Sequence, residues 1–210
     1  MLDLALTSAV ALLVTIDPIG TGPVFAALTR GSDDAHRRRM AVKGVLIAAG
    51  ILFVFAFAGN FLLRALGIGF PAFRIAGGIL LLLLAIDMAF ARPSGLRSTT
   101  EPEQEEATHK EDISVFPLAI PLIAGPGALT SLLLLMGRTD GDPLGQAVVL
   151  GVLALVLLAN LAVLLAAGKV TKLMGVTGVN VVNRILGILL AALACQFVID
   201  GILESGIVNT

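Results

Sequence analysis

One proline–glycine motif occurs twice in this chain, each time inside a long apolar segment. The first copy runs from Pro18 to Pro23 and the second from Pro121 to Pro126; both read Pro-x-x-x-Gly-Pro, 103 residues apart. A proline inside a helix removes a backbone donor and clashes with the preceding turn, so both segments are expected to be unwound at the motif. In lipid, freed backbone groups are tolerated where protein or a watery cavity surrounds them. Two such breaks at matching positions predict the central binding site of a transporter.

Six stretches of the chain are long and apolar enough to cross a membrane. The residues are 57% hydrophobic and only 14% charged, whereas a soluble domain carries about a quarter charged residues. A helix needs about 20 residues to cross the roughly 30 Å hydrocarbon core. The apolar runs are continuous, which excludes the alternating strands of a β-barrel. The sequence therefore predicts an all-α membrane protein with six transmembrane helices, at residues 4–29, 44–63, 72–91, 113–136, 144–167 and 183–204.

Basic residues are distributed unequally between the two sides of these six helices. The loops after helices one, three and five, with the start of helix six, hold eleven of the fourteen: Arg30, Arg37, Arg38, Arg39, Lys43, Arg92, Arg97, Lys110, Lys169, Lys172 and Arg184. Because loops rich in Lys and Arg face the cytoplasm, both termini are expected outside it. The polar stretch 92–112 is interpreted as a cytoplasmic linker between two three-helix halves, residues 1–91 and 113–210, of one membrane domain.

A second duplicated pattern extends the similarity between the two halves. The pattern Arg-Ile-x-Gly-x-x-Leu begins at Arg74 and again at Arg184, and Asn60 corresponds to Asn160. Because each half has three spans, the second must be upside-down relative to the first, which predicts two inverted three-helix repeats with broken helices one and four. All four residues are interpreted as structural. The arginines either snorkel to the interface or pair with helix-end carbonyls or a carboxylate.

The symmetry fails at Asp17, whose counterpart in the second motif is Ile120. A carboxylate near the bilayer centre costs at least about 2.5 kcal/mol when it faces lipid, so Asp17 is expected to face the protein interior. Two interpretations stay open, and one residue can satisfy both. Asp17 binds a substrate ammonium or a coupling proton or cation, or it caps the helix that restarts at Pro18.

The glycines of the two motifs predict a site for an anionic group. Freed N–H groups at the start of a half-helix carry partial positive charge and bind carboxylates, and glycine lets a ligand approach them closely. Together with Asp17, the candidate substrate-binding residues are Gly20, Thr21, Gly22, Gly125, Gly127, Thr130 and Ser131. For the hydroxyls of Thr130 and Ser131, a hydrogen bond back to the preceding turn is the competing structural interpretation.

These motifs resemble those of the MarC family of six-span bacterial and archaeal inner-membrane proteins, also classed as small neutral amino-acid transporters. The resemblance covers the whole chain and rests on three motifs: Asp17-Pro18-x-Gly20-x-x-Pro23, Arg74-Ile75-x-Gly77-Gly78-Ile79 and Pro121-Leu122-x-x-Gly125-Pro126-Gly127-Ala128-x-Thr130. It implies transport of glycine- or alanine-sized amino acids, driven by an ion gradient. Family members usually have asparagine where this chain has Thr21, and that departure bears on substrate identity.

Other classes of function fit these residues less well. An enzyme is not expected, because His36 and His109 lie in predicted loops and a single midplane aspartate cannot form an aspartyl dyad. No metal or cofactor is expected. The net charge of −1 and the absence of basic clusters with interleaved aromatics argue against nucleic acid as a partner. The favoured function is a secondary transporter of small neutral amino acids, coupled to protons or sodium ions. The alternatives are a small-solute channel and a non-transporting scaffold subunit; the expected partners are membrane lipid and substrate, with a homo-oligomer left open.

Overall fold

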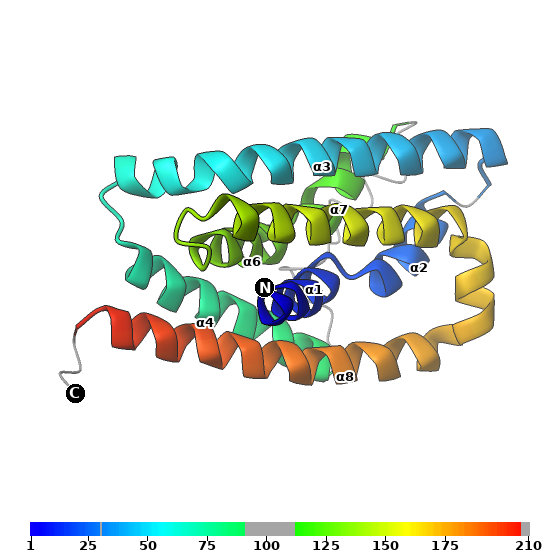
Figure 1. The fold of residues 1–210 in the computed structure, drawn as a ribbon. Coiled ribbons are helices and arrows are strands. Elements are labelled where there is room, and N and C mark those ends of the chain that lie inside the picture. The colour runs from blue at the N-terminus through cyan, green and yellow to red at the C-terminus, as the bar shows by residue number, and fades with distance from the viewer. Residues whose placement is uncertain (30, 91–111, 207–210) are drawn as a thin grey trace.

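The computed structural model describes residues 1–29, 31–90 and 112–206, which form a bundle of long helices (Figure 1). In chain order the elements are α1 (Leu2–Ile16), α2 (Pro18–Leu28), α3 (Asp34–Ala65), α4 (Phe70–Ala89), η1 (Ser114–Ile123), α6 (Pro126–Gly137), α7 (Pro143–Leu165) and α8 (Ala167–Glu204). Except for Asp112, the predicted linker at 92–112 lies outside the described residues.

The helices confirm the predicted all-α membrane fold. Five helical spans are long and apolar enough to cross a bilayer, and η1 with α6 forms a sixth, bent by 54° at its break. The third helix in chain order, α3, begins ten residues earlier than the sequence predicted, at Asp34. Its early start follows from Asp33, whose side chain accepts a hydrogen bond from the His36 N–H at 2.7 Å and caps the helix before the apolar run begins.

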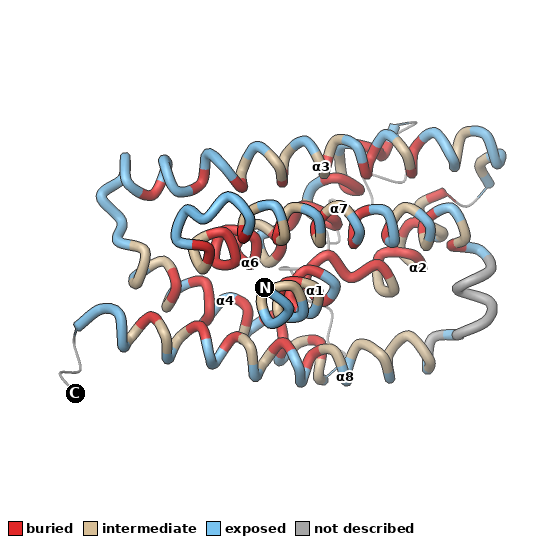
Figure 2. The backbone as a smooth tube through the Cα atoms, viewed as in Figure 1, coloured by how far each residue is buried: buried red, intermediate tan, exposed pale blue. Residues whose placement is uncertain are grey.

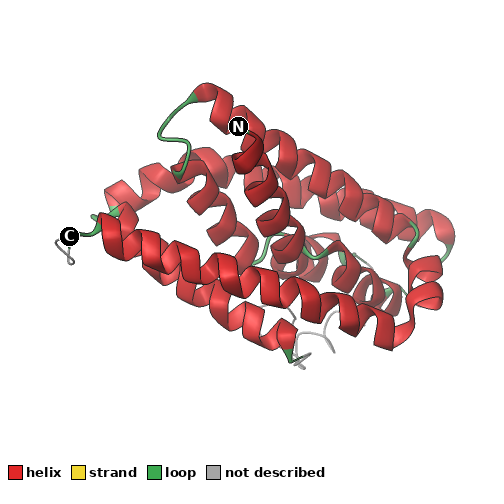
Figure 3. Cartoon of the chain, turned by 60° about the horizontal axis from the view of Figure 1, so that its bottom comes forward, coloured by secondary structure: helices red, strands yellow, loops and turns green. Residues whose placement is uncertain are grey.

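Burial is concentrated in the broken helices and on the inward faces of the long ones (Figure 2). In α6 every residue from Thr130 to Met136 is buried. The outward faces of the long helices instead carry large exposed apolar side chains, such as Phe57 on α3 and Leu155 on α7. Outward-facing apolar side chains suit a lipid environment. A second viewpoint shows helices and short loops, with no strand among the described residues (Figure 3).

Corresponding helices of the two halves run in opposite directions. In Figure 1, α3 and α7 run antiparallel, and so do α4 and α8. The broken helix of each half packs against the middle helix of the other, α1 and α2 against α7, and η1 and α6 against α3. This exchange of partners is the arrangement that the predicted inverted repeats require. The division into halves at 1–91 and 113–210 stays a prediction.

The closest helix pair is α4 with α8, and glycines bring their backbones together. A Cβ added at one of three glycines would lie within 3.0 Å of a backbone oxygen of the facing helix: Gly78 at 2.8 Å from Ala194 O, Gly187 at 2.9 Å from Ala85 O and Gly201 at 3.0 Å from Pro71 O. Small residues at such contacts let membrane helices approach closely without a hydrophobic driving force. The α4–α8 pair is therefore the most tightly joined unit of the bundle.

A methyl group added at Gly78 should destabilise the protein. Gly78→Ala places its Cβ 2.8 Å from the Ala194 carbonyl oxygen, a backbone atom that cannot rotate away, and overpacking of this kind costs about 1–3 kcal/mol. Gly151→Ala is the matched control, because Gly151 also lies inside a helix but has nothing within 4 Å of an added Cβ. Thermal unfolding in one detergent compares the two variants. An equal change in both would contradict the close α4–α8 contact.

Candidate functional site

The break in the first span is one residue long and consists of Asp17. Its backbone is left-handed, with φ 47° and ψ 69°, a conformation that aspartate and asparagine adopt more readily than other residues with side chains. Its carboxylate Oδ1 accepts a hydrogen bond from the Gly20 N–H at 3.0 Å, and its carbonyl oxygen accepts one from the Thr21 N–H at 3.0 Å. Asp17 is 3% exposed. The helix-cap interpretation is confirmed; a role with substrate or ion stays a prediction.

The expected unwinding across residues 18–23 is wrong. The chain is helical again from Pro18 and continues through Pro23, which lies inside α2. Proline at the first helical position loses no hydrogen bond, and its fixed φ suits the helix, so the cap by Asp17 is enough to restart it. The N–H groups of Gly20 and Thr21 are occupied by Asp17 and are not available to a ligand. Gly22 serves the packing of α2, because a Cβ there would lie 3.2 Å from a methyl carbon of Val163 on α7.

The fourth span is interrupted, as the sequence predicted, and its interruption is longer than that of the first span. Phe116 and Ile120 each precede a proline and have extended backbones, with φ −127° and −130°, because the ring of a following proline disfavours the helical region. After η1 ends, α6 restarts at Pro126 with Gly125 as its N-terminal cap residue, which has no side chain to accept a hydrogen bond. The hydrogen bonds found among the described residues include none from the N–H groups of Gly127 and Ala128. The start of α6 is therefore an uncapped helix N-terminus.

The start of α6 lies beside the end of α1. The methyl carbon Cγ2 of Thr15 lies 3.8 Å from the position that a Cβ would take at Gly127. Thr15 is buried, and its hydroxyl donates to the Ala11 carbonyl oxygen at 2.8 Å. The uncapped N-terminus of α6 thus meets the last turn of α1, two residues before Asp17. Sequence analysis did not single out Thr15, although a polar residue in an apolar helix was a usable signal.

Asn160 of α7 binds to the first turn of α2. Its Oδ1 accepts a hydrogen bond from the Thr21 hydroxyl at 2.9 Å, and it is 0% exposed. Its amide nitrogen Nδ2 is buried and has no partner. Asn160, interpreted from the sequence as structural, therefore links the two predicted halves beside Asp17 and also leaves a donor unused. Asn60, its predicted counterpart, is exposed near the end of α3.

The two hydroxyl residues of α6 are both buried. The Thr130 methyl carbon lies 2.6 Å from the position of a Cβ at Gly77, so Thr130 faces α4 across a glycine contact. The Ser131 hydroxyl is 0% exposed and has no partner, so it does not make the back-bond to the preceding turn. Ser131 joins Asn160 as a second polar group with unused hydrogen-bonding capacity in the interior.

The arginines of the second duplicated pattern have different environments. Arg74 is buried, forms an ion pair with Glu204 and lies with its guanidinium carbon 5.0 Å from the centre of the Phe70 ring. The predicted pairing with a carboxylate is thus confirmed for Arg74. Arg184 is exposed and has no ion pair among the described residues. A neighbouring pair, Arg138 with Asp200 at 2.8 Å, ties α6 to α8 at the same end of the bundle.

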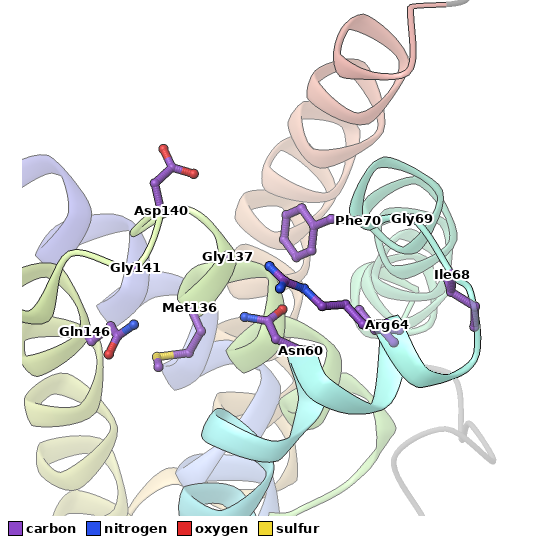
Figure 4. Close-up of a pocket in the computed structure, with 11 residues that line it drawn as sticks. Asn60, Arg64, Ile68, Gly69, Phe70, Met136, Gly137, Asp140, Gly141 and Gln146 are labelled. Carbon is purple, nitrogen blue, oxygen red and sulfur yellow. The ribbon is translucent and has the colours of Figure 1, made fainter.

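A cavity of about 520 Å³ lies at this end, between the end of α3, the start of α4 and the end of α6 (Figure 4). Asn60 and Arg64 reach into it from α3, and Phe70, Asp140 and Gln146 also line it. None of the predicted substrate-binding residues lines this cavity. In the part of the chain that the structure describes, no group of three His, Cys, Asp or Glu residues is placed to hold a metal ion.

Comparison with known proteins identifies the relatives of this broken-helix bundle. The model of the MarC family, described as "MarC family integral membrane protein", matches residues 2–205. The chain belongs to the MarC family. It is 34% identical over 193 residues to a UPF0056 membrane protein of Archaeoglobus fulgidus, an alignment that covers 92% of this chain and 89% of that one. It is 35% identical over 197 residues to the UPF0056 inner membrane protein YhgN of Escherichia coli (strain K12), covering 94% and 95%.

No solved structure matches the chain. The family assignment confirms the resemblance seen in the motifs, and this MarC family chain is accordingly an integral membrane protein. The Escherichia coli relative is named an inner membrane protein.

Which end of the present bundle faces the cytoplasm stays a prediction from the basic residues. Arg64, Arg74 and Arg138 do lie together at the end where α3 leads into α4, and the basic start of α3 lies at the other end.

The ion pair at the start of the second half predicts a pH dependence of stability. The Lys43 ammonium, helped by the Ser114 hydroxyl, holds the pKa of Asp112 well below its usual range. An unfolded aspartate has a pKa of about 3.9, so this stabilisation is fully present above about pH 4 and is lost as the pH falls through the lower folded pKa. Asp112 is about half exposed, so water screens the pair and limits it to about 1 kcal/mol.

Asp112→Asn should therefore be less stable than the parent at pH 7, with a difference that shrinks as the pH falls below 4. Unfolding in detergent at several pH values measures this difference. Asp3→Asn is the control, because Asp3 is exposed at the start of α1. A constant difference between pH 7 and pH 3 would contradict the assignment.

Proposed function

We propose that this protein is a secondary transporter that moves small neutral amino acids, of glycine or alanine size, across the inner membrane by alternating access coupled to a proton or sodium gradient. The observation that carries the proposal is the meeting of two helix breaks in the buried interior. One break holds a carboxylate, Asp17, and the other an uncapped helix N-terminus, at Gly127. Interrupted helices with such termini at the midplane are typical of secondary transporters.

The two breaks suit the two charges of an amino acid. A zwitterion that leaves water needs a counter-charge for its ammonium and donors for its carboxylate, because an unpaired buried charge is very costly. Asp17 provides the negative charge. The N–H groups of Gly127 and Ala128 provide donors at the positive end of the α6 dipole. The corresponding N–H groups of α2 are already bound by Asp17, so the substrate carboxylate is assigned to α6.

The walls around the α6 break favour a compact substrate. A Cβ at Gly127 would come within 2.8 Å of a Leu84 methyl carbon, so there is little room beyond the glycine backbone itself. In the part of the chain that the structure describes, two buried polar atoms, Asn160 Nδ2 on α7 and Ser131 Oγ on α6, have no hydrogen-bond partner. An unsatisfied buried polar group costs about 1–3 kcal/mol, and a polar ligand that contacts it recovers part of that cost.

The packing supports movement of the broken helices against a fixed frame. The α4–α8 pair is joined backbone to backbone at three glycines, whereas α1, α2, η1 and α6 contain the interruptions. The Arg138–Asp200 pair connects α6 to this frame at one end. Opening that end requires this ion pair to separate. Alternating access needs a rigid unit, here α4 with α8, and contacts at the ends of the bundle that can separate.

Counterflow in proteoliposomes tests the proposal against its alternatives. Vesicles preloaded with unlabelled glycine or alanine should take up the labelled amino acid transiently above equilibrium, with saturation, and an imposed proton or sodium gradient should drive net accumulation. A channel would equilibrate label without counterflow. A scaffold subunit would leave uptake at the level of empty vesicles. Either result would contradict the proposed function.

The variant Asp17→Asn distinguishes the role of Asp17 as a helix cap from its role as a negative charge. Asparagine also adopts the left-handed conformation and accepts the Gly20 N–H bond, so only the negative charge is lost. Gradient-driven accumulation of glycine or alanine should fall about tenfold or more, the loss expected for about 1.4 kcal/mol of binding, with exchange spared if the carboxylate serves only the coupling ion. Asp3→Asn, an exposed aspartate of the same first span, should transport like the parent. A folded Asp17→Asn protein that accumulates substrate like the parent would leave Asp17 as a helix cap only.

A further inference from the structure

A second cavity lies at the opposite end of the bundle from the Arg74–Glu204 pair. It has a volume of about 860 Å³ and is formed between the start of α3 and the end of α7. Its lining is divided by chemistry. Asp34, Arg37 and Arg38 of α3 form one wall, and the other wall is made of the small and apolar residues Ala162, Leu164, Leu165, Ala166 and Gly168. It shares no residue with the helix breaks.

The polar wall has an excess of positive charge. Arg37 donates from Nη2 to the Ser32 carbonyl oxygen at 3.2 Å and lies 3.6 Å from a carboxylate oxygen of Asp34. The Asp34 side chain is 98% exposed, so this ion pair is screened by water and weak. The Nε of Arg37 is buried and has no partner. Arg38 is exposed beside it. The Nε atom is out of reach of a ligand, but the Arg37 side chain is 37% exposed. The exposed parts of the two guanidinium groups offer planar donors that suit a phosphate group.

The apolar wall indicates which kind of phosphate-bearing molecule would fit the cavity. Leu164 is buried at 1% exposure, whereas Leu165 is 51% exposed and Ala162 is also exposed, so this wall continues onto the outward, apolar surface of α7. A free phosphate ion makes no use of such a surface. The glycerol and first acyl carbons of a phospholipid can pack against such a surface, because lipid chains and apolar side chains are alike in polarity.

We infer that this cavity binds an anionic phospholipid, with the headgroup phosphate against Arg37 and Arg38 and the upper acyl region against Leu165 and Ala162. The distribution of basic residues predicts that this end of the bundle lies in the cytoplasmic leaflet. That leaflet is negatively charged, and basic pockets between helices on that side bind anionic headgroups. The inference does not depend on the transported substrate.

Retention of lipid by the purified protein tests the site without any measurement of transport. The protein is exchanged into detergent with mixed micelles of phosphatidylglycerol and phosphatidylcholine, and bound lipid is counted by native mass spectrometry while thermal unfolding is followed. The parent should retain phosphatidylglycerol over phosphatidylcholine and be stabilised by it. The double variant Arg37→Gln/Arg38→Gln should bind phosphatidylglycerol about thirtyfold more weakly, as expected for the loss of two cationic contacts.

The matched control is Arg39→Gln/Arg64→Gln, which removes the same charge from two exposed arginines that do not line the cavity. An equal loss of phosphatidylglycerol in this control would mean general electrostatic attraction and overturn the site. Leu165→Asn keeps both arginines but removes part of the apolar wall. It should weaken the binding of phosphatidylglycerol and leave any binding of inorganic phosphate unchanged. If inorganic phosphate stabilises the parent as well as the lipid does and displaces it, the cavity is a phosphate site and the lipid assignment is wrong.

If the double variant does not fold, Arg37→Lys provides the test. It keeps the charge but loses the planar donors of the guanidinium. Phosphatidylglycerol retention should fall with phosphatidylcholine retention unchanged, and unaltered selectivity would overturn the role of Arg37.

Discussion

The fold depends on one constraint, which is that a membrane-buried backbone must satisfy its own polar groups. Two of its spans break the helical ladder, and among the described residues the freed N–H groups are capped by a side chain at the first break and not at the second. At the first break, Asp17 supplies both a carboxylate oxygen and a carbonyl oxygen to the first turn of α2. At the second, Gly125 supplies no side chain and α6 begins uncapped. The repeated motif therefore produces one capped and one uncapped helix start, and the uncapped start is the one proposed to bind the substrate carboxylate.

The surroundings of the breaks are built from contacts that act over long sequence separations. Thr21 and Asn160 join α2 to α7, and Arg138 and Asp200 join α6 to α8. The glycine contacts between α4 and α8 hold these two helices together. One contact is buried and the other partly exposed, and together they hold the broken helices against α7 and α8. The broken helices are thus held in place by contacts with helices that are distant in the sequence.

Local signals in the sequence were enough for much of this architecture. Apolar length predicted the six spans, and Pro121, Gly125 and Pro126 predicted the bend before α6. The Asp-Pro pair predicted the cap at Asp17, because capping is decided within one helical turn. The prediction failed inside α2, where Pro23 is accommodated within the helix. Nothing in the local sequence distinguishes a proline that ends a helix from one that neighbouring helices support.

Contacts between distant residues could not be predicted in the same way. A carboxylate was one of the partners that the sequence left open for Arg74. The partner, Glu204, lies 130 residues away, and the antiparallel packing of α4 and α8 brings the two together. Asn160 was expected to be structural on account of Asn60, yet the two asparagines have opposite exposure. A repeat in sequence specifies similar helices. It does not specify similar surroundings for each side chain once the halves pack against each other.

The unequal lengths of the two breaks give the broken spans different mechanical freedom. A single residue has two soft backbone torsions, so the joint at Asp17 acts as a pivot: α2 can swing relative to α1 while the length of the span stays nearly constant. The second span has extended residues at Phe116 and Ile120 and a further gap at Ala124 and Gly125. With that many torsions outside the helical region, it can shorten or extend along its axis. The first span can therefore change its angle at Asp17, whereas the fourth span can change its length. The two predicted halves need not undergo the same motion.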